Sequence, residues 1–374
     1  MLLSTKMSFK GEKGDMKRAG QFLIIGLIMV VLAACGSGKS GNNANNGASE
    51  AAAGNNAAAN AEQPAAETPA ESYKIAISQY VEHPSLDATR EGFLAALKDA
   101  GLEEGVNLTI DYNNAQADST NNLSIAQKIA NEENDLVYAI ATPSALAVAQ
   151  AVKETPVLFA AVTDPLASKL VDNLEAPSGN VTGASDTNPI AVQQIMDFIA
   201  QYFPNVKSVG IVINEGEENA VIMANNAEEA LKKHGIELVR AAVTNTGEVK
   251  QAAESLVGRA DALFITLDNT VVSGVDSIIQ IANEHDIPFF SSDRDTVEKG
   301  AFVTVGFKYY DHGYQSGQMA VEILKNGKKP SELSVSFPDK VDFIFNMKAA
   351  AEQGIDVTDE MKAAVKDPAN NIIE

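Results

Sequence analysis

Residues 136–165 read LVYAIATPSALAVAQAVKETPVLFAAVTDP. Two short apolar runs, 136–141 and 157–160, have the length and composition of buried strands, and the longer segment 143–154 between them is predicted to be a helix. A strand, a helix and a second strand in this order form a βαβ unit, in which the two strands are parallel. The stretch therefore predicts an α/β fold.

The same alternation continues from Tyr73 through most of the chain. Strands are predicted at residues 74–78, 108–112, 136–141, 157–160 and 181–184, and then at 206–213, 237–242, 262–267, 288–291 and 302–305. Helices are predicted at residues 85–100, 120–132 and 143–154, and then at 220–234, 249–257, 271–285 and 311–325. This pattern predicts two successive doubly wound, Rossmann-like units of about 110 to 120 residues each, which is an ordinary domain size.

The loops at the carboxyl ends of the strands are the expected place for a functional site. Right-handed crossovers put helices on both faces of each sheet, and the loops at the carboxyl ends then share one edge. If the two edges face each other, the loops define a cleft between two lobes, where small-molecule sites commonly occur.

The amino-terminal segment has the pattern of an export signal. The basic pair Lys17 and Arg18 precedes an apolar run over residues 22–34, which is too short to span a full bilayer, and Cys35 follows in the sequence LAAC. The pattern resembles the bacterial lipobox, which implies cleavage before Cys35, lipidation of this cysteine and anchoring at the extracytoplasmic face of the cell membrane. The alternatives are an ordinary transmembrane anchor and a buried structural cysteine.

A second amino-terminal segment, residues 36–72, consists mainly of Gly, Ser, Asn, Ala, Gln, Glu and Pro. Such a composition buries too little apolar surface to offset the entropy cost of ordering the chain, so we expect a flexible tether. The export segment before it, residues 1–35, starts at either Met1 or Met16.

Charge and residue content exclude several classes of function. The formal net charge is −22, and the first 34 residues hold five Lys or Arg and two Asp or Glu, so the processed chain is near −25. Nucleic acid and anionic lipid are therefore not expected as partners. The four histidines are far apart, and HExxH, GxSxG and CxxC motifs are absent from the sequence.

These observations favour binding over catalysis. ATP and NADH are not readily available outside the cytoplasmic membrane, and the single cysteine is assigned to the lipid. The adjacent carboxylates Glu217 and Glu218 have the character of surface residues. We expect no catalytic residues, no cofactor and no bound metal.

Five blocks of the sequence carry a family resemblance. They are residues 80–93 (YVEHPSLDATREGF), 140–145 (IATPSA), 161–165 (AVTDP), 179–183 (GNVTG) and 266–273 (TLDNTVVS). In their order and spacing they resemble ABC-transporter substrate-binding proteins of the tryptophan/tyrosine-binding TrpX-like family, over roughly residues 73–354. Residues 291–295 (SSDRD) depart from the Gly-rich, acidic form expected at that loop.

The resemblance implies a type I periplasmic-binding fold, whose two lobes are joined by a hinge and close on a small molecule. It also implies ABC permease and ATPase subunits as partners. We expect lobe 1 to comprise residues 73–187 and about 310–336, and lobe 2 residues 188–309 and about 337–374.

In the first lobe, Thr142 and Ser144 flank a proline at a predicted helix start. Free backbone N–H groups and the positive end of the helix dipole suit a ligand carboxylate there. Thr163 has the same placement after the next strand. The alternative for Thr142 and Ser144 is that they cap their own helix.

In the second lobe, Asp268 and Asn269 lie between a predicted strand and a predicted helix. An ionised Asp268 would accept hydrogen bonds from a ligand ammonium group. Capping of the following helix is assigned instead to Asn269 or Thr270. Asp293 is a second acidic candidate, and Asn214 contacts the ligand or turns the chain.

An aromatic ligand would need an apolar or aromatic wall. The candidates are Tyr80, His83, Tyr309 and Tyr310, and Glu82 lies at the edge of the first strand. The tyrosine pair can equally pack at the hinge. The sequence therefore predicts a lipid-anchored solute receptor of an ABC importer that binds an amino acid, preferably an aromatic one. A nucleoside or sugar receptor is the alternative.

Overall fold

The computed structural model describes residues 71–188, 190–338 and 340–374. The predicted export segment, the lipidation site at Cys35 and the tether up to residue 70 lie outside the described residues. Among the residues described, none of the helices combines the length and apolar character that crossing a bilayer requires.

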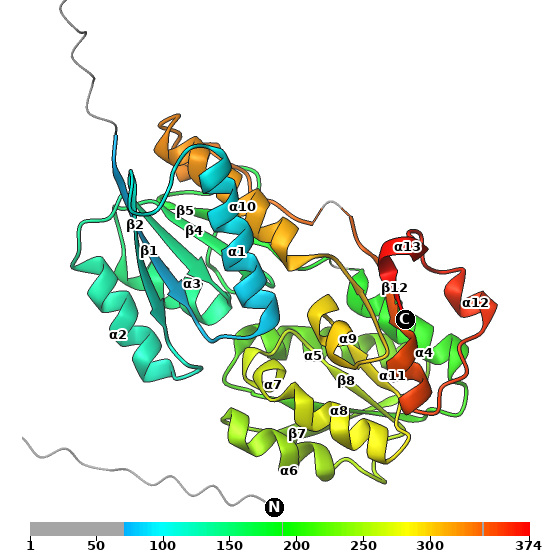
Figure 1. Cartoon of the computed structure of the whole chain (residues 1–374). Helices are drawn as coiled ribbons and strands as arrows, with labels where there is room; N and C mark the ends of the chain where they lie inside the picture. The colour runs from blue at the N-terminus through cyan, green and yellow to red at the C-terminus, as the bar shows by residue number, and fades with distance from the viewer. Residues whose placement is uncertain (1–70, 189, 339) are drawn as a thin grey trace, which may run out of the picture. The chain divides into compact units, whose positions relative to one another are not determined.

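The first lobe is built on a five-stranded parallel sheet with strand order β2-β1-β3-β4-β5 (Figure 1). Its strands are β1 (Tyr73–Gln79), β2 (Leu108–Asn114), β3 (Leu136–Ile140), β4 (Val157–Val162) and β5 (Val181–Ser185). Its helices are α1 (Pro84–Asp99), α2 (Ser119–Ala130), α3 (Thr142–Ala151) and α10 (Tyr309–Leu324).

Successive residues of each buried strand supply the two faces of this sheet. On β1, Ile75 and Ile77 pack with α1 and α10, while Ala76 packs with α2 and α3. Side chains alternate between the faces of a strand, so an uninterrupted apolar run indicates helices on both sides. The doubly wound arrangement predicted from the sequence is confirmed.

The second lobe contains a seven-stranded sheet with order β12-β11-β10-β9-β8-β6-β7, in which only the β10–β11 pair is antiparallel. Its strands are β6 (Ser208–Ile213), β7 (Glu237–Ala242), β8 (Ala262–Ile265), β9 (Phe289–Ser291), β10 (Val303–Gly306), β11 (Asp342–Asn346) and β12 (Ile372–Ile373). The helices are α4 (Ala191–Tyr202), α5 (Glu218–Lys233), α6 (Val249–Glu254), α7 (Asn269–Ser273), α8 (Val275–Glu284), α9 (Arg294–Lys299), α11 (Met347–Glu352), α12 (Asp359–Lys362) and α13 (Pro368–Asn371). One face of the sheet packs with α4 and α5 and the other with α6 and α8.

One predicted helix, residues 271–285, is divided in the structure into α7 and α8. The break lies at Gly274, where a Cβ would contact Val249 and Thr246 tightly. Glycine is also a poor helix former, so this position ends one helix and starts the next. The sequence patterns did not predict α4, α9 or the elements after residue 337.

Helix α10 follows strands β6 to β10 of the second lobe in the sequence but packs in the first lobe, against α1 (Figure 1). A Cβ at Gly313 would overlap the carbonyl oxygen of Thr89, and one at Gly92 would overlap that of Tyr310. Ser316 Oγ lies 2.7 Å from the hydroxyl of Tyr138 in β3. Close backbone contact therefore holds α10 on the first sheet.

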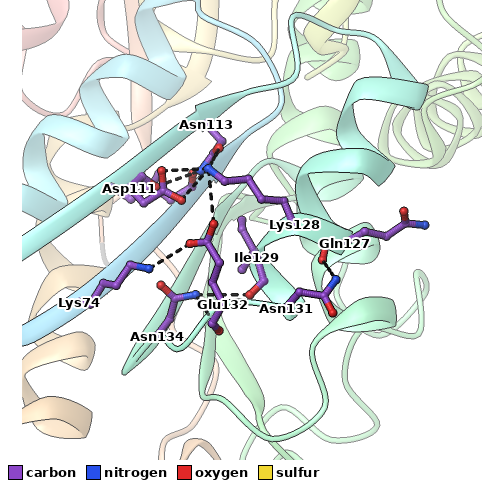
Figure 2. A network of polar contacts seen from close by, with 10 residues as sticks. Lys74, Asp111, Asn113, Gln127, Lys128, Ile129, Asn131, Glu132 and Asn134 are labelled. Atoms are coloured by element: carbon purple, nitrogen blue, oxygen red, sulfur yellow. Dashed lines mark hydrogen bonds and ion pairs between the residues drawn. The ribbon is translucent and has the colours of Figure 1, made fainter.

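A polar network ties α2 to the edge of the first sheet (Figure 2). Lys128 Nζ donates to Asp111 Oδ2 at 2.9 Å and to Asn113 Oδ1 at 2.9 Å, and Lys74 Nζ donates to Glu132 Oε2 at 3.0 Å. Partial burial acts to raise the pKa of Asp111, but the hydrogen bonds from Lys128 and Asn113 outweigh it and lower this pKa. The network joins α2 and Glu132, just after this helix, to β1 and β2, so it contributes to the scaffold.

Candidate functional site

A small enclosed cavity lies between the carboxyl edges of the two sheets, with an empty volume of about 280 Å³. It is lined by His83, Ser85, Leu86, Ala161, Asp186, Leu267, Asn269, Val272, Asp293 and Tyr309. We call it the polar cavity. It is too narrow to hold an amino acid unless the lobes separate.

Two direct hydrogen bonds join the lobes at this cavity. His83 Nε2 lies 3.3 Å from Asn269 Oδ1, and Ser85 Oγ donates to Asp293 Oδ1 at 3.2 Å. Burial lowers the pKa of His83, so its ring is neutral at pH 7. With Nε2 donating to Asn269, Nδ1 is a hydrogen-bond acceptor, and it has no partner among the described residues.

The start of α1 positions the residues of the first lobe in this cavity. His83 has an extended backbone, and Pro84 occupies the first turn of the helix, where its missing N–H costs nothing. The two residues beside this proline, His83 and Ser85, therefore reach the edge of the sheet together.

On the opposite side, the buried carboxylate of Glu217 holds the start of α7. Its Oε1 accepts from the backbone N–H and the hydroxyl of Thr270, and its Oε2 accepts from the backbone N–H and the Nδ2 of Asn269 at 3.1 and 2.6 Å. These bonds orient Asn269 toward His83. The expectation that Glu217 is a surface residue is wrong, because its side chain satisfies buried donors of the second lobe.

Asp268 is completely buried and caps α7, where it accepts from the backbone N–H of Val271 at 3.0 Å and of Asn214 at 2.6 Å. Burial, and then the charge of Glu217, raise the pKa of Asp268. The expectation that Asn269 or Thr270 caps this helix is wrong. Asp268 does not line the polar cavity, and its role toward a ligand ammonium stays a prediction.

Asp293 lines the polar cavity and also caps α9. Its Oδ1 accepts from Thr296 N at 2.7 Å as well as from Ser85, and its Oδ2 accepts from the hydroxyls of Thr296 and Ser291. Two residues further on, burial and the charge of Asp293 raise the pKa of Asp295 to about 7. The loop that departs from the family pattern thus places two acids at the interface.

The threonines and the serine expected to bind a carboxylate are buried in the first lobe. Thr163 N donates to Thr142 Oγ1 at 3.4 Å, and Ser144 Oγ donates to Asn122 Oδ1 at 3.1 Å. These three residues do not line the polar cavity, although Ala161, near the end of β4, does. They support the loops around it.

Two of the predicted site residues point elsewhere. Glu82 is exposed and accepts from the hydroxyl of Tyr112 at 3.0 Å, and Tyr310 is 43 % exposed. Tyr309 is buried in the cavity instead, because neighbouring residues of a helix face directions about 100° apart. Including Tyr310 at the site is therefore a wrong prediction.

Tyr80 is buried, and its hydroxyl donates to the carbonyl oxygen of Ala117 at 3.2 Å. Burial raises the pKa of Tyr80, and the nearby charges of Glu217 and Asp268 raise it further. Asn214 donates from its Nδ2 to the Thr270 hydroxyl at 3.0 Å. Tyr80 and Asn214 thus lie close to the interface without lining the cavity.

The sequence patterns missed Asp186, which directly follows β5 and lines the polar cavity. The hydroxyl of Tyr309 donates to its Oδ2 at 3.1 Å, and that of Thr187 donates to its Oδ1 at 3.3 Å. Burial raises the pKa of Asp186 to about 6 against the opposing effect of these hydrogen bonds. The sequence feature that could have identified Asp186 is its position as an acidic residue just after a predicted strand.

A second cavity, with an empty volume of about 340 Å³, adjoins the first. It is lined by Asp186, Thr187, Asn188, Ala191, Val192, Ile195, Met223, Leu267, Ser292, Val305, Phe307 and Val341. We call it the apolar cavity. Asp186 and Leu267 line both cavities, so the two spaces meet at these side chains.

Two doubly wound lobes with a polar cavity between their carboxyl edges define the class of two-lobed solute-binding proteins, in the type I periplasmic-binding fold. Residues 74–367 match the sequence family described as ABC transporter substrate binding protein. The chain belongs to this family.

Similar proteins include the tyrosine-binding protein of Clostridioides difficile (strain R20291), which is 39 % identical over 272 residues, covering 73 % of this chain and 78 % of the relative. A crystal structure of a conserved domain protein from Vibrio cholerae O1 biovar eltor is 39 % identical, with a TM-score of 0.76 over 81 % of this chain and 100 % of the other. A Streptococcus pneumoniae ABC domain in complex with L-Trp is 31 % identical, with a TM-score of 0.75 and the same coverage.

A further relative is a ligand-free structure. The ligand-free, open structure of a substrate-binding protein with adhesive properties from Clostridium difficile is 38 % identical, yet its TM-score is 0.58 over 80 % of this chain and 98 % of the other. Its sequence identity is close to that of the Vibrio cholerae protein. The contacts of His83 and Ser85 across the cleft agree with a closed arrangement here.

Proposed function

We propose that this protein captures an aromatic amino acid between its lobes, at the extracytoplasmic face of the membrane, and delivers it to an ABC permease and ATPase. The observation that carries the proposal is the acid-lined cavity at the facing edges of two lobes, in a chain 39 % identical to a tyrosine-binding protein. The complex of a 31 % identical protein with L-Trp supports the same class of ligand.

Opening and closing of the lobes is part of the proposal. The contacts His83–Asn269 and Ser85–Asp293 give way when the lobes separate, and the ligand then takes over their hydrogen-bonding groups as the lobes close. We propose His83, Asn269 and Asp293 as ligand contacts. Tyr80, Thr142, Ser144, Thr163, Asn214 and Asp268 are proposed to shape and support the loops around the ligand.

The proposed lobe boundaries follow the three places where the chain passes between the sheets. These lie after β5, before α10 and between α10 and β11. Lobe 1 then comprises residues 73–187 and about 310–336. Lobe 2 comprises residues 188–309 and about 337–374.

The proposal includes a lipid anchor on Cys35 and a role in binding instead of catalysis. Family membership supports a solute-binding role outside the cytoplasm. The LAAC sequence at the end of the apolar run supports the anchor.

The second candidate function, a nucleoside or sugar receptor, has weaker support. The structural neighbours that carry sugars in their names, such as a glucose-galactose binding protein from Geobacillus stearothermophilus, are at most 17 % identical and share only the fold.

Thermal-shift screening of the full-length protein in detergent tests the proposal. The ligands are L-tyrosine, L-tryptophan, L-phenylalanine, adenosine, uridine, glucose and galactose. A true ligand at a hundred times its Kd stabilises the folded state by roughly 2.7 kcal/mol. We expect stabilisation by at least one aromatic amino acid and none by the sugars or nucleosides. Stabilisation by a sugar or nucleoside alone would overturn the proposal.

A further inference from the structure

Asp186 lies where the polar and apolar cavities meet, on the segment that leads from the first lobe to the second. Its side chain is only 5 % exposed. None of the ion pairs formed by the described residues includes it. A buried carboxylate without a cationic partner is costly, and a positive group of a ligand would offset that cost.

The donors to Asp186 differ from those of the other acids at the interface. Asp268 receives two backbone N–H groups, and Asp293 receives one backbone N–H and three hydroxyls. Asp186 receives only the hydroxyls of Tyr309 and Thr187, which can rotate toward other acceptors. Of the two acids that line the polar cavity, Asp186 is therefore better able to accept a new donor without breaking a helix cap.

The polar cavity as a whole suits a cation. Two carboxylates, Asp186 and Asp293, line it together with His83, whose neutral Nδ1 is a buried acceptor without a partner. No Lys or Arg side chain lines it. A ligand ammonium group, which has three donors, matches this set of acceptors.

The apolar cavity suits a hydrophobic side chain. Val192, Ile195 and Met223 line it together with Phe307 and Val341, while the neighbouring polar cavity holds most of the charged groups. A ligand whose α-carbon lies beside Asp186 can place its ammonium group on one side and an aromatic ring on the other.

We infer that Asp186 binds the ammonium group of the ligand and that the apolar cavity receives its side chain, once the lobes have opened to admit it. This inference rests on the proposed function and specifies how the same site recognises its ligand. It assigns to Asp186 the role that the sequence pattern gave to Asp268.

The first test is isothermal titration of the full-length protein with L-tyrosine, and with 3-(4-hydroxyphenyl)propionate, which lacks the amine, measured by competition. In Asp186→Asn we expect the affinity for L-tyrosine to fall about 10- to 100-fold, since hydrogen bonds to charged groups contribute about 1.5 to 3 kcal/mol. The affinity for the analogue stays within about 3-fold. Asp172→Asn, at an exposed carboxylate that also accepts a backbone N–H, is the matched control and leaves both affinities unchanged.

The outcomes separate the inference from the proposed function. If the wild-type protein binds L-tyrosine and Asp186→Asn binds it equally well, the inference is overturned and the proposed function stands. Equal losses for both ligands also overturn it, because the effect is then structural. If the same selective loss appears in Asp268→Asn and not in Asp186→Asn, Asp268 binds the amine. If the wild-type protein binds no aromatic amino acid, the proposed function itself is wrong.

The second test places a larger side chain in the apolar cavity. Ala191 lies at the first position of α4, where it is partly exposed, so a larger side chain can enter the cavity without replacing a core residue. In Ala191→Phe we expect the affinity for L-tryptophan to fall at least 10-fold, with an unchanged Tm for the unliganded protein. Unchanged affinity in a folded Ala191→Phe variant would overturn the placement of the side chain.

Discussion

At the scale of single residues, the site is governed by buried carboxylates in different surroundings. Glu217 is satisfied by groups at the start of α7, whereas Asp186 has only two hydroxyl donors. Fixed N–H donors favour the ionised form of an acid, while burial without them favours the neutral form. Glu217 therefore holds the scaffold, whereas Asp186 is free to respond to a ligand.

The raised pKa of Asp186 predicts a pH dependence. Because its pKa is about 6 in the folded protein and 3.8 in the reference state, its contribution to folding stability is fully present below about pH 4 and is lost as the pH rises through 6. The titratable groups that share its cavity are Tyr309, Asp293 and His83. Ammonium binding requires the ionised form, so affinity for L-tyrosine should rise from pH 5 to pH 7.

Titration calorimetry across this pH range checks the prediction. We expect the rise in affinity to disappear in Asp186→Asn, which carries no titrating group at this position. A pH profile that is the same in wild type and variant would assign the effect to another residue, with Asp295 as the next candidate because burial raises its pKa to about 7.

At the scale of elements, the crossing of α1 and α10 determines how the first lobe is completed. Three glycines, Gly92, Gly313 and Gly317, allow the two backbones to touch. Behind the crossing, Phe93 stacks on Tyr138 with ring centroids 3.7 Å apart. A helix from late in the sequence thereby becomes part of the core of the first sheet.

Replacement of Gly313 by alanine has two opposing effects on the free energy of unfolding. Helix propensity alone would stabilise the variant by about 1 kcal/mol. The added Cβ overlaps the Thr89 carbonyl, however, and overpacking costs about 1 to 3 kcal/mol or more. We expect the second effect to prevail, so urea denaturation should show a lower free energy of unfolding. Gln318→Ala on the same helix is the control, and a more stable Gly313→Ala would contradict the close contact.

Most elements could be predicted from the sequence because their periodicity is local. The strand at residues 74–78 and the helix at 85–100 follow from runs of apolar residues, and the structure places β1 and α1 there. The break at Gly274 was missed, because a single glycine within an apolar pattern does not by itself end a helix. The tight packing of Val249 and Thr246 against this position is not visible in a local pattern.

The site was predicted less completely, for a similar reason. The loops around His83, Asn269 and Asp293 were identified because they follow strands, and these residues do meet at one cavity. Tyr309 lies in the cavity and Tyr310 does not, because only the rotation of α10 about its axis decides between these neighbours. Most of the donors that satisfy the buried Glu217 are 52 or 53 residues away in the chain.

At the scale of the whole molecule, we expect Cys35 to decide where the protein resides. Each buried acyl methylene contributes about 0.8 kcal/mol of membrane affinity, so a lipidated amino terminus retains the protein at the membrane. Cys35→Ala should shift the protein from the membrane fraction to the soluble fraction and abolish labelling by radioactive palmitate. L-tyrosine affinity should be unchanged. A variant that remains membrane-bound would favour an ordinary transmembrane anchor.

The late position of α10 in the sequence also has a consequence for biosynthesis. Until residue 324 has left the ribosome, the face of the first sheet that carries Ile75, Ile77 and Tyr138 lacks one of its two covering helices. We therefore expect the nascent amino-terminal half to lack a complete core until α10 has been synthesised. The interleaved order of the chain delays folding until nearly the entire polypeptide has been made.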